Sequence, residues 1–116
     1  MDLINETSLE SLRAMDEGAG IFLRDILALY LNESENILNE IVNEATSGSI
    51  EKMNKAAHKL KGSSLSVGAI GFAEQCSLFE KTSSFQSDEE KNEMISKLKD
   101  LYSNTKKEFD KIISSN

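Results

Sequence analysis

The stretch "IEKMNKAAHKLKGSSLSVGA", residues 50–69, carries the clearest helical periodicity in this chain. Its apolar and small residues recur at steps of three and four, as they do along the inner face of an amphipathic helix. Ser49 precedes the stretch as a candidate N-cap, and Gly68 begins a tight connection that runs to Gly71. The predicted inner stripe consists of Ile50, Met53, Ala57, Leu60, Ser64 and Val67.

The same spacing continues on the N-terminal side of this segment, and the chain contains no proline. A capping-box pattern at Thr7–Glu10 predicts a short helix, which the Gly18–Gly20 segment interrupts. A long helix follows and ends at Gly48. Its predicted inner stripe consists of Phe22, Ile26, Leu27, Tyr30, Ile37, Leu38, Ile41, Val42 and Ala45.

Two more helices are predicted after the connection. The first directs Ile70, Ala73, Cys76 or Ser77, and Phe79 toward the core. A second capping box, Ser87–Glu90, starts the last helix. Its inner residues are Met94, Ile95, Leu98, Leu101 or Tyr102, Thr105, Phe109 and Ile112. Short connections between four substantial helices predict an all-α antiparallel four-helix bundle with a short additional N-terminal helix, and a single domain over residues 1–116.

The composition limits the chemistry of this chain. Its formal net charge is −7, from 20 acidic and 13 basic residues, which disfavours binding to nucleic acid. No apolar run approaches the ~20 residues that span a bilayer, so no membrane contact is expected. One cysteine, Cys76, allows no internal disulfide, and a reduced cytoplasmic setting is expected. One histidine and one cysteine do not complete a zinc site, and neither a calcium loop nor a phosphate-binding glycine loop is visible.

His58 is the only histidine of the chain. A helical wheel with 100° per residue places it about 130° from the centre of the stripe over residues 50–67, so it should point away from the core. On the same face, Lys61 lies three residues further on, Gly62 lies one turn further on and Leu65 lies two turns further on.

Each neighbour of His58 has a functional and a plain explanation. A mid-helix glycine costs ~1 kcal/mol relative to alanine, so Gly62 indicates close approach of a partner unless the helix merely tolerates it. Lys61 can reach an oxyanion on the imidazole and Lys59 raises the local potential, although a solvated lysine face is the commoner pattern. Leu65 is either part of a docking patch or a single exposed leucine.

Glu80 lies at a similar height on the next helix. His58 is ten residues before Gly68, and Glu80 is nine residues after Gly71. If Glu80 faces the seam between the two helices, its carboxylate can accept the Nδ1–H of His58 and leave Nε2 exposed. The alternative is an exposed glutamate that pairs with Lys81 or with water.

These residue types together suit one kind of chemistry. An exposed imidazole is largely neutral near neutral pH and is therefore nucleophilic. A carboxylate to orient it, a lysine to neutralise a dianion and a glycine that leaves space suit the receipt of a phosphoryl group. No magnesium or nucleotide site is visible, so a carrier that depends on a partner is expected.

The stretch "HKLKGSSLSVG" resembles the signature of histidine-containing phosphotransfer (HPt) domains, H-x-[LI]-K-G-[SA]-[SA]-x(3)-G. The family also has Glu or Gln 22 residues after the histidine, and Glu80 matches that position. The residues that match the signature are His58, Lys61, Gly62, Ser63, Ser64 and Gly68.

The resemblance implies a phosphorelay intermediate. Such a domain takes a phosphoryl group from the aspartate of one receiver domain and passes it to another, and the receiver supplies Mg²⁺. His58 would then be the phosphorylated residue, with no cofactor or metal bound by this chain itself. In this interpretation Lys61 stabilises the phosphate, Glu80 orients His58 and Gly62 provides clearance, while Lys59 and Ser63 have supporting roles.

The family also docks its partners through an apolar patch near the histidine. The partners implied are receiver domains of sensor hybrid kinases and of response regulators, bound by a monomer. Several candidate docking residues can equally belong to the core. The candidates by position are Leu9, Leu12, Met15, Phe22, Asp25, Ile26 and Leu65.

Three alternatives compete with a phosphoryl carrier. A helical scaffold that binds a receiver domain without phosphotransfer is the main one, although it has no need of an intact reactive histidine. The chemotaxis-kinase phosphotransfer domain shares His-x-x-Lys-Gly, but nothing here resembles its kinase portions. A small hydrolase built on His58 lacks a strand-turn-helix serine elbow.

Overall fold

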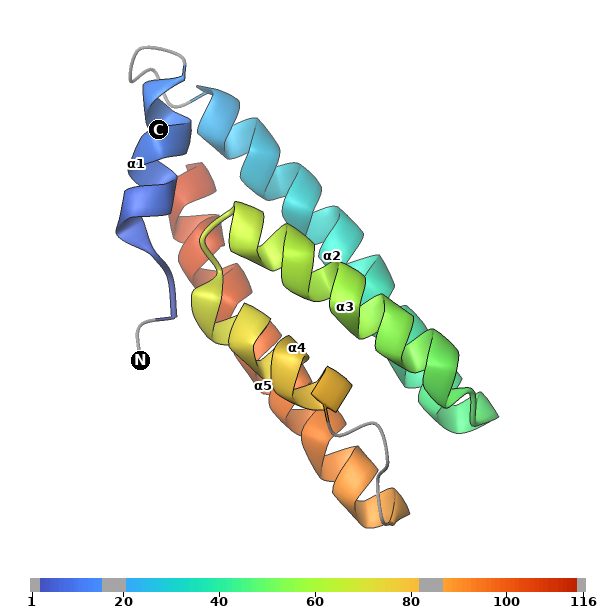
Figure 1. Ribbon diagram of the computed structural model, residues 1–116. Coiled ribbons are helices and arrows are strands. Elements are labelled where there is room, and N and C mark those ends of the chain that lie inside the picture. Colours follow the sequence, from blue (N-terminus) through green and yellow to red (C-terminus); the bar gives the residue numbers. More distant parts are fainter. Residues whose placement is uncertain (1–2, 16–20, 82–86, 115–116) are drawn as a thin grey trace.

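The computed structural model describes residues 3–15, 21–81 and 87–114, and these residues form an all-helical bundle. The longer helices run beside one another, and the shortest helix lies at the end where α2 begins and α5 ends (Figure 1). The predicted fold class is therefore confirmed. The helices are α1 (Glu6–Ala14), α2 (Ile21–Ser47), α3 (Ile50–Ser66), α4 (Ile70–Lys81) and α5 (Asp88–Ser114).

The four long helices form a closed ring of neighbours. α2 packs against α3 and α5, and α4 packs against the same two helices. α3 and α5 are therefore diagonal to each other across the core. This order places one face of α3 toward solvent between α2 and α4, and that face carries the sole histidine.

The predicted inner stripes supply most of the core. Ile41, Leu60, Leu98 and other stripe residues have no exposed side-chain surface or almost none. Ile50 is an exception, because it is the first residue of α3, and 48% of its surface is exposed. On α4 the buried face is wider than predicted, because Phe72 is fully buried in addition to Phe79.

The helix starts follow the capping pattern with one correction. Ser49 Oγ accepts the backbone N–H of Lys52 at 3.4 Å, and Ser87 Oγ accepts that of Glu90 at 3.1 Å, as predicted. The short helix is capped by Asn5 instead of Thr7, because Asn5 Oδ1 accepts the N–H of Thr7 at 2.9 Å.

Buried hydroxyl groups connect α2 to α3 and to α5. The hydroxyls of Tyr30 and Ser64 lie 2.7 Å apart, and Tyr102 donates to the carbonyl of Leu31 at 2.7 Å. Ser34 Oγ also donates to the Tyr102 hydroxyl at 3.3 Å. Burial raises the pKa of Tyr30 well above its ordinary value, so this hydroxyl stays protonated. These four buried hydroxyls are therefore paired, as most buried polar groups are.

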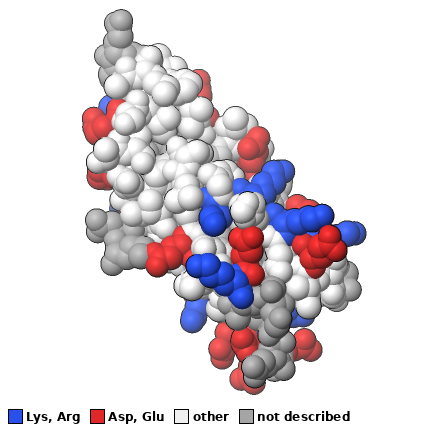
Figure 2. Space-filling model, in the orientation of Figure 1, with Lys and Arg blue, Asp and Glu red and all other residues white. Residues whose placement is uncertain are grey.

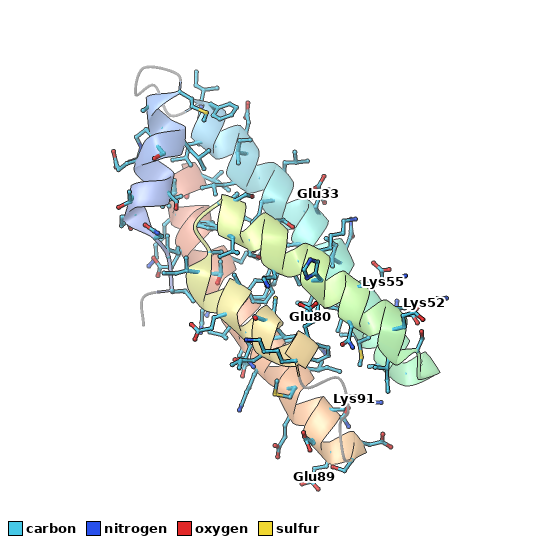
Figure 3. All side chains as sticks on the ribbon, viewed as in Figure 1. Glu33, Lys52, Lys55, Glu80, Glu89 and Lys91 are labelled. Atoms are coloured by element: carbon cyan, nitrogen blue, oxygen red, sulfur yellow. The ribbon has the colours of Figure 1, made fainter. Side chains whose placement is uncertain are left out.

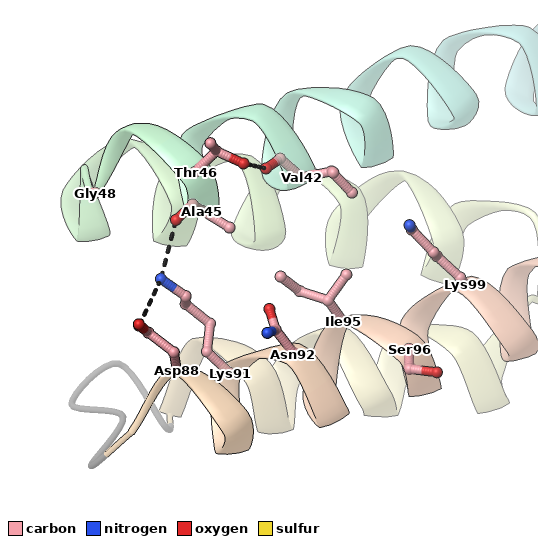
Figure 4. A pocket seen from close by; sticks show the side chains of 10 residues that line it. All are labelled: Val42, Ala45, Thr46, Gly48, Asp88, Lys91, Asn92, Ile95, Ser96 and Lys99. Atoms are coloured by element: carbon pink, nitrogen blue, oxygen red, sulfur yellow. Dashed lines mark hydrogen bonds and ion pairs between the residues drawn. The ribbon is translucent and has the colours of Figure 1, made fainter.

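Lys91 joins the end of α2 to the start of α5 (Figure 4). Its Nζ donates to the carbonyl of Ala45 at 2.9 Å and lies 3.6 Å from the Asp88 carboxylate. The side chain of Lys91 is 19% exposed. A cation at a helix C-terminus stabilises the carbonyls that have no partner within the helix.

The N-terminal segment holds the connection between α3 and α4. The N–H of Asn5 donates to the Gly68 carbonyl at 2.7 Å, and the N–H of Gly71 donates to the Leu3 carbonyl at 3.1 Å. Gly68 has a φ of +78°, which side chains other than glycine adopt at a cost. A Cβ atom on Gly68 would lie 3.0 Å from the Asn5 carbonyl oxygen and from Ser8 Cβ. The glycine therefore allows both the turn and the close contact.

Gly68→Ala should destabilise the protein more than Gly48→Ala does. Gly48 has a similar φ of +87°, but nothing lies within 4 Å of a Cβ added there. Each change should cost about 1 kcal/mol for the left-handed backbone, and Gly68→Ala should lose at least about 1 kcal/mol more because of the crowding. Urea denaturation measures both free energies of unfolding. Equal losses of unfolding free energy in the two variants would show that the N-terminal segment moves away from the added methyl group without an energetic cost.

Candidate functional site

His58 lies on the solvent face of α3, as the helical wheel predicted. Its side chain is 67% exposed. Leu60, Ala57 and Ser64 of the same helix are fully buried and face the interior. The geometry of the helix and the burial of its stripe therefore leave the imidazole accessible to a partner.

Glu80 binds the imidazole from α4. Its Oε1 and Oε2 atoms lie 3.1 Å and 3.2 Å from His58 Nδ1. Figure 3 shows the Glu80 carboxylate directed from α4 toward α3. Because an ionised carboxylate only accepts hydrogen bonds, this contact favours the tautomer with the proton on Nδ1, in which Nε2 has the lone pair. The predicted contact between His58 and Glu80 is confirmed. Glu80 therefore pairs with the histidine instead of with Lys81.

The packing of α4 explains where Glu80 lies. Phe79 is fully buried, and Glu80 is the next residue, so its side chain emerges at the seam instead of on the outer surface. The Glu80 side chain is 32% exposed, so water reaches only part of it. The turn at Gly68 sets the register that brings these two positions, 22 residues apart, to one height.

A shallow hollow lies beside the pair and is lined by Glu51, Asn54, Lys55, His58 and Glu80. Asn54 Oδ1 is buried and has no hydrogen-bond partner among the described residues. Sequence reasoning missed Asn54, although it lies four residues before His58 and hence one turn away on α3. A buried acceptor of this kind is commonly satisfied by water.

Gly62 lies in the middle of α3 on the exposed face. A Cβ atom there would have nothing within 4 Å. The backbone is helical at this position, so alanine would fit and would stabilise the helix by ~1 kcal/mol. The contacts within the described fold therefore give no reason for a glycine at this position.

The other predicted residues on α3 differ in accessibility. Lys59 is exposed and Lys61 is half-buried, and neither ammonium has a carboxylate within 4.0 Å in the described part of the chain. Ser63 Oγ donates to the Lys59 carbonyl at 2.9 Å. This bond engages the Ser63 hydroxyl proton within the helix.

The candidate docking residues divide into exposed and buried ones. Met15 is 68% exposed, Leu65 is 49% exposed and Phe22 is 37% exposed. Asp25 is also exposed. Leu9 is fully buried, so its assignment to a docking surface is wrong and it belongs to the core.

Two of the remaining candidates lie at the edge of the core. Leu12 and Ile26 are partly buried and pack against it. Each therefore offers only part of its side chain to a partner. The spacing of residues along the helices did not distinguish this partial burial from full exposure.

Sequence reasoning also missed exposed apolar residues on α2. Leu29 is 54% exposed and Ile21 is 55% exposed. Leu29 follows Phe22 by seven residues and Asp25 by four, so the three share one face of the helix. The sequence signal for this exposed position was a leucine that lies outside the predicted inner stripe of the helix. Figure 2 shows a broad uncharged area over this end of the bundle, adjacent to the basic side chains of α3.

Two further findings bear on the kind of protein. In the described ranges, no three His, Cys, Asp or Glu side chains gather closely enough to hold a metal ion. Among the same residues, every helix is too short or too polar to traverse a lipid bilayer.

The helical bundle with an exposed, carboxylate-held histidine is the arrangement of a phosphotransfer domain. The family model described as "Hpt domain" matches residues 25–108, which is more than half of the chain. The chain therefore belongs to the Hpt domain family.

Individual relatives agree with this assignment. Histidine-containing phosphotransfer protein 4 of Arabidopsis thaliana is 28% identical over 78 residues, which is 66% of this chain and 61% of that protein. The chain thus spans less than two thirds of this curated relative.

Two solved structures share the fold. A rice protein assigned as a histidine-containing phosphotransfer protein superposes with a TM-score of 0.84 at 21% identity, over 96% of this chain and 79% of that one. Histidine-containing phosphotransfer protein B of Pseudomonas aeruginosa PAO1 superposes with a TM-score of 0.84 at 19% identity, over 98% of this chain and 96% of that one. At these identities the likeness concerns the fold.

Glu80→Ala should remove the preference of His58 for the Nδ1–H tautomer. Glu80→Gln should preserve it, because the amide oxygen still accepts a hydrogen bond. Nitrogen-15 NMR of the imidazole distinguishes the two ring nitrogens. Glu51→Ala is the matched control, since Glu51 lines the same hollow but pairs with Lys55 at 3.3 Å. An unchanged tautomer in Glu80→Ala would contradict the orienting role.

Proposed function

We propose that this chain is a phosphoryl carrier of a two-component phosphorelay, with His58 as the residue that receives and passes on the phosphoryl group. The observation that supports it most is the exposed imidazole whose Nδ1 lies 3.1 Å from the Glu80 carboxylate. The arrangement leaves Nε2 as the reactive atom. Membership of the Hpt domain family supports the same role.

The transfer step follows from this geometry. The Nε2 lone pair attacks the phosphorus of an aspartyl phosphate, the new N–P bond forms, and the P–O bond to the aspartate breaks with its electrons leaving on the carboxylate. The imidazole then carries a positive charge, which the Glu80 carboxylate stabilises through the Nδ1–H bond. The reverse sequence delivers the phosphoryl group to a second aspartate.

Lys61 and Gly62 have separate tasks in this proposal. Lys61 lies one turn from His58 on α3 and neutralises charge on the phosphoryl oxygens. Gly62 leaves room for the partner backbone beside the imidazole. The partner, a receiver domain of a hybrid kinase or of a response regulator, supplies Mg²⁺ and its acidic pocket, so the chain acts as a carrier without its own ATP or metal site.

The receiver docks on an apolar surface beside His58, which we define as Met15, Phe22, Leu29 and Leu65 together with Asp25. These side chains are exposed, and Leu65 lies two turns from His58 on the same face of α3. Exposed apolar groups grouped in this way are typical of interaction sites.

We also propose that the chain works as a monomer in the cytoplasm. Cys76 is fully buried, and burial raises the pKa of its thiol to about 12. A buried thiol of this kind is chemically inert and does not link two copies through a disulfide.

His58→Gln should abolish phosphorylation and leave the helical content and the free energy of unfolding nearly unchanged, because the side chain is exposed. The measurement is transfer of isotopic label from a phosphorylated receiver domain with Mg²⁺, tested on a panel of receivers. Label on the wild type alone, lost in acid and retained in base, supports the proposal. Binding of a receiver without any label on the wild type would favour a scaffold that does not transfer.

Gly62→Gln should slow phosphoryl transfer, and Gly62→Ala should affect it much less. Both variants should fold, since a Cβ atom at this exposed position meets nothing within 4 Å. Gly62→Ala should gain up to ~1 kcal/mol in the free energy of unfolding. Transfer rates and urea denaturation on both variants separate the two effects. Transfer by Gly62→Gln at the wild-type rate would contradict the clearance role.

A further inference from the structure

The charge of the molecule is unevenly distributed among its helices. α3 carries four lysines against one glutamate. Each of the other helices has an acidic excess; α2, for instance, has one arginine against five carboxylates, and α5 has six lysines against seven carboxylates. In a chain of net charge −7, the helix that bears His58 is thus the only net positive helix among the described residues.

The lysines flank His58 on both sides. With 100° per residue, Lys55, Lys59 and Lys52 lie about 60°, 100° and 120° from His58 toward one side, and Lys61 lies about 60° toward the other. Figure 3 shows Lys52 and Lys55 projecting from the same side of α3. Figure 2 shows basic side chains gathered over this helix.

The stability of α3 does not account for this row. Lys52 and Lys55 are three residues apart, and Lys55 and Lys59 are four apart, so both pairs place like charges next to each other and destabilise the helix. Lys52 also lies in the first turn, where the helix dipole disfavours a cation. These positions thus oppose what the isolated helix prefers.

Neighbouring carboxylates neutralise the row only in part. Glu51 pairs with Lys55 at 3.3 Å, and Glu80 is engaged by His58. Glu33, labelled in Figure 3, is an exposed carboxylate of the neighbouring helix α2. Lys52, Lys59 and Lys61 have no carboxylate within 4.0 Å in the part of the chain that the structure describes. Three cations without a carboxylate partner therefore lie on the helix that bears His58.

We propose that Lys52, Lys55, Lys59 and Lys61 form an electrostatic guide that draws in a protein partner whose binding face is rich in carboxylates. This inference rests on the proposed function and adds the charge of the partner and the kinetic role of the lysines. The apolar docking surface holds the complex together, whereas the guide accelerates the encounter, because charges at the rim of an interface act mainly on the association rate.

The test is the association rate constant of the chain with a receiver domain loaded with Mg²⁺ and beryllofluoride, which prevents phosphoryl transfer during the measurement. The receiver used is the one from a panel that binds the wild type most tightly. The charge-reversed variant is Lys52→Glu with Lys59→Glu. The matched control is Lys97→Glu with Lys107→Glu, which makes the same charge change at exposed positions of the diagonal helix α5.

The charge-reversed variant should associate about tenfold more slowly at low salt, with a smaller change in the dissociation rate. At 0.5 M NaCl, where the screening length is only ~4 Å, the difference should fall below twofold. The α5 control should stay within about twofold of the wild type. Lys52→Arg with Lys59→Arg should keep the wild-type rate, because it preserves the charge.

Two outcomes would overturn the guide. One is an equal loss in the α5 control, which would make net charge alone responsible. The other is an association rate that does not change with salt or with charge reversal. The label experiment on His58 is independent of this measurement, so failure of phosphoryl transfer is recognised separately from failure of the guide.

Discussion

The reversal of the chain at Gly68 is the constraint on which the site depends. The left-handed backbone at this residue turns α3 into α4, and the carbonyl of Gly68 accepts a hydrogen bond from Asn5, which ties the turn to the N-terminal segment. His58 and Glu80 lie at equal heights on the two arms only because this turn has one length and one direction. A slip of one residue would rotate Glu80 by about 100° away from the seam and release the imidazole.

Much of this arrangement could be predicted from the sequence, because helical periodicity is a local property. The exposure of His58 and its contact with Glu80 follow from counting residues along two helices and across one turn. Two of the incorrect predictions concern packing between helices. Leu9 is buried because α1 closes the end of the bundle, and Ile50 is exposed because it is the first residue of α3, at the other end. The missed cap at Asn5 is a local error instead, because Asn5 Oδ1 accepts the N–H groups of Thr7 and Ser8 and asparagine is a favoured N-cap residue.

Stability and function have different requirements on α3. Its inner face follows the packing rules, with Leu60 in the core and Ser64 paired with Tyr30. Its outer face departs from them twice, at Gly62, where the fold has room for a side chain, and along the lysine row, where like charges are adjacent. Both features lie on the helix that carries His58. Local departures from what the helix prefers are expected at sites that serve an external partner.

The burial of Cys76 has a practical consequence. Cys76 lies on the buried face of α4, so the folded protein presents no thiol to reagents in solution. A cysteine introduced at an exposed serine of α5, such as Ser103, would be the sole attachment point for a fluorophore or a spin label. The molecule is thus ready for distance measurements on single complexes, with a dye placed diagonally across the bundle from the reactive face and no need to remove a native residue first.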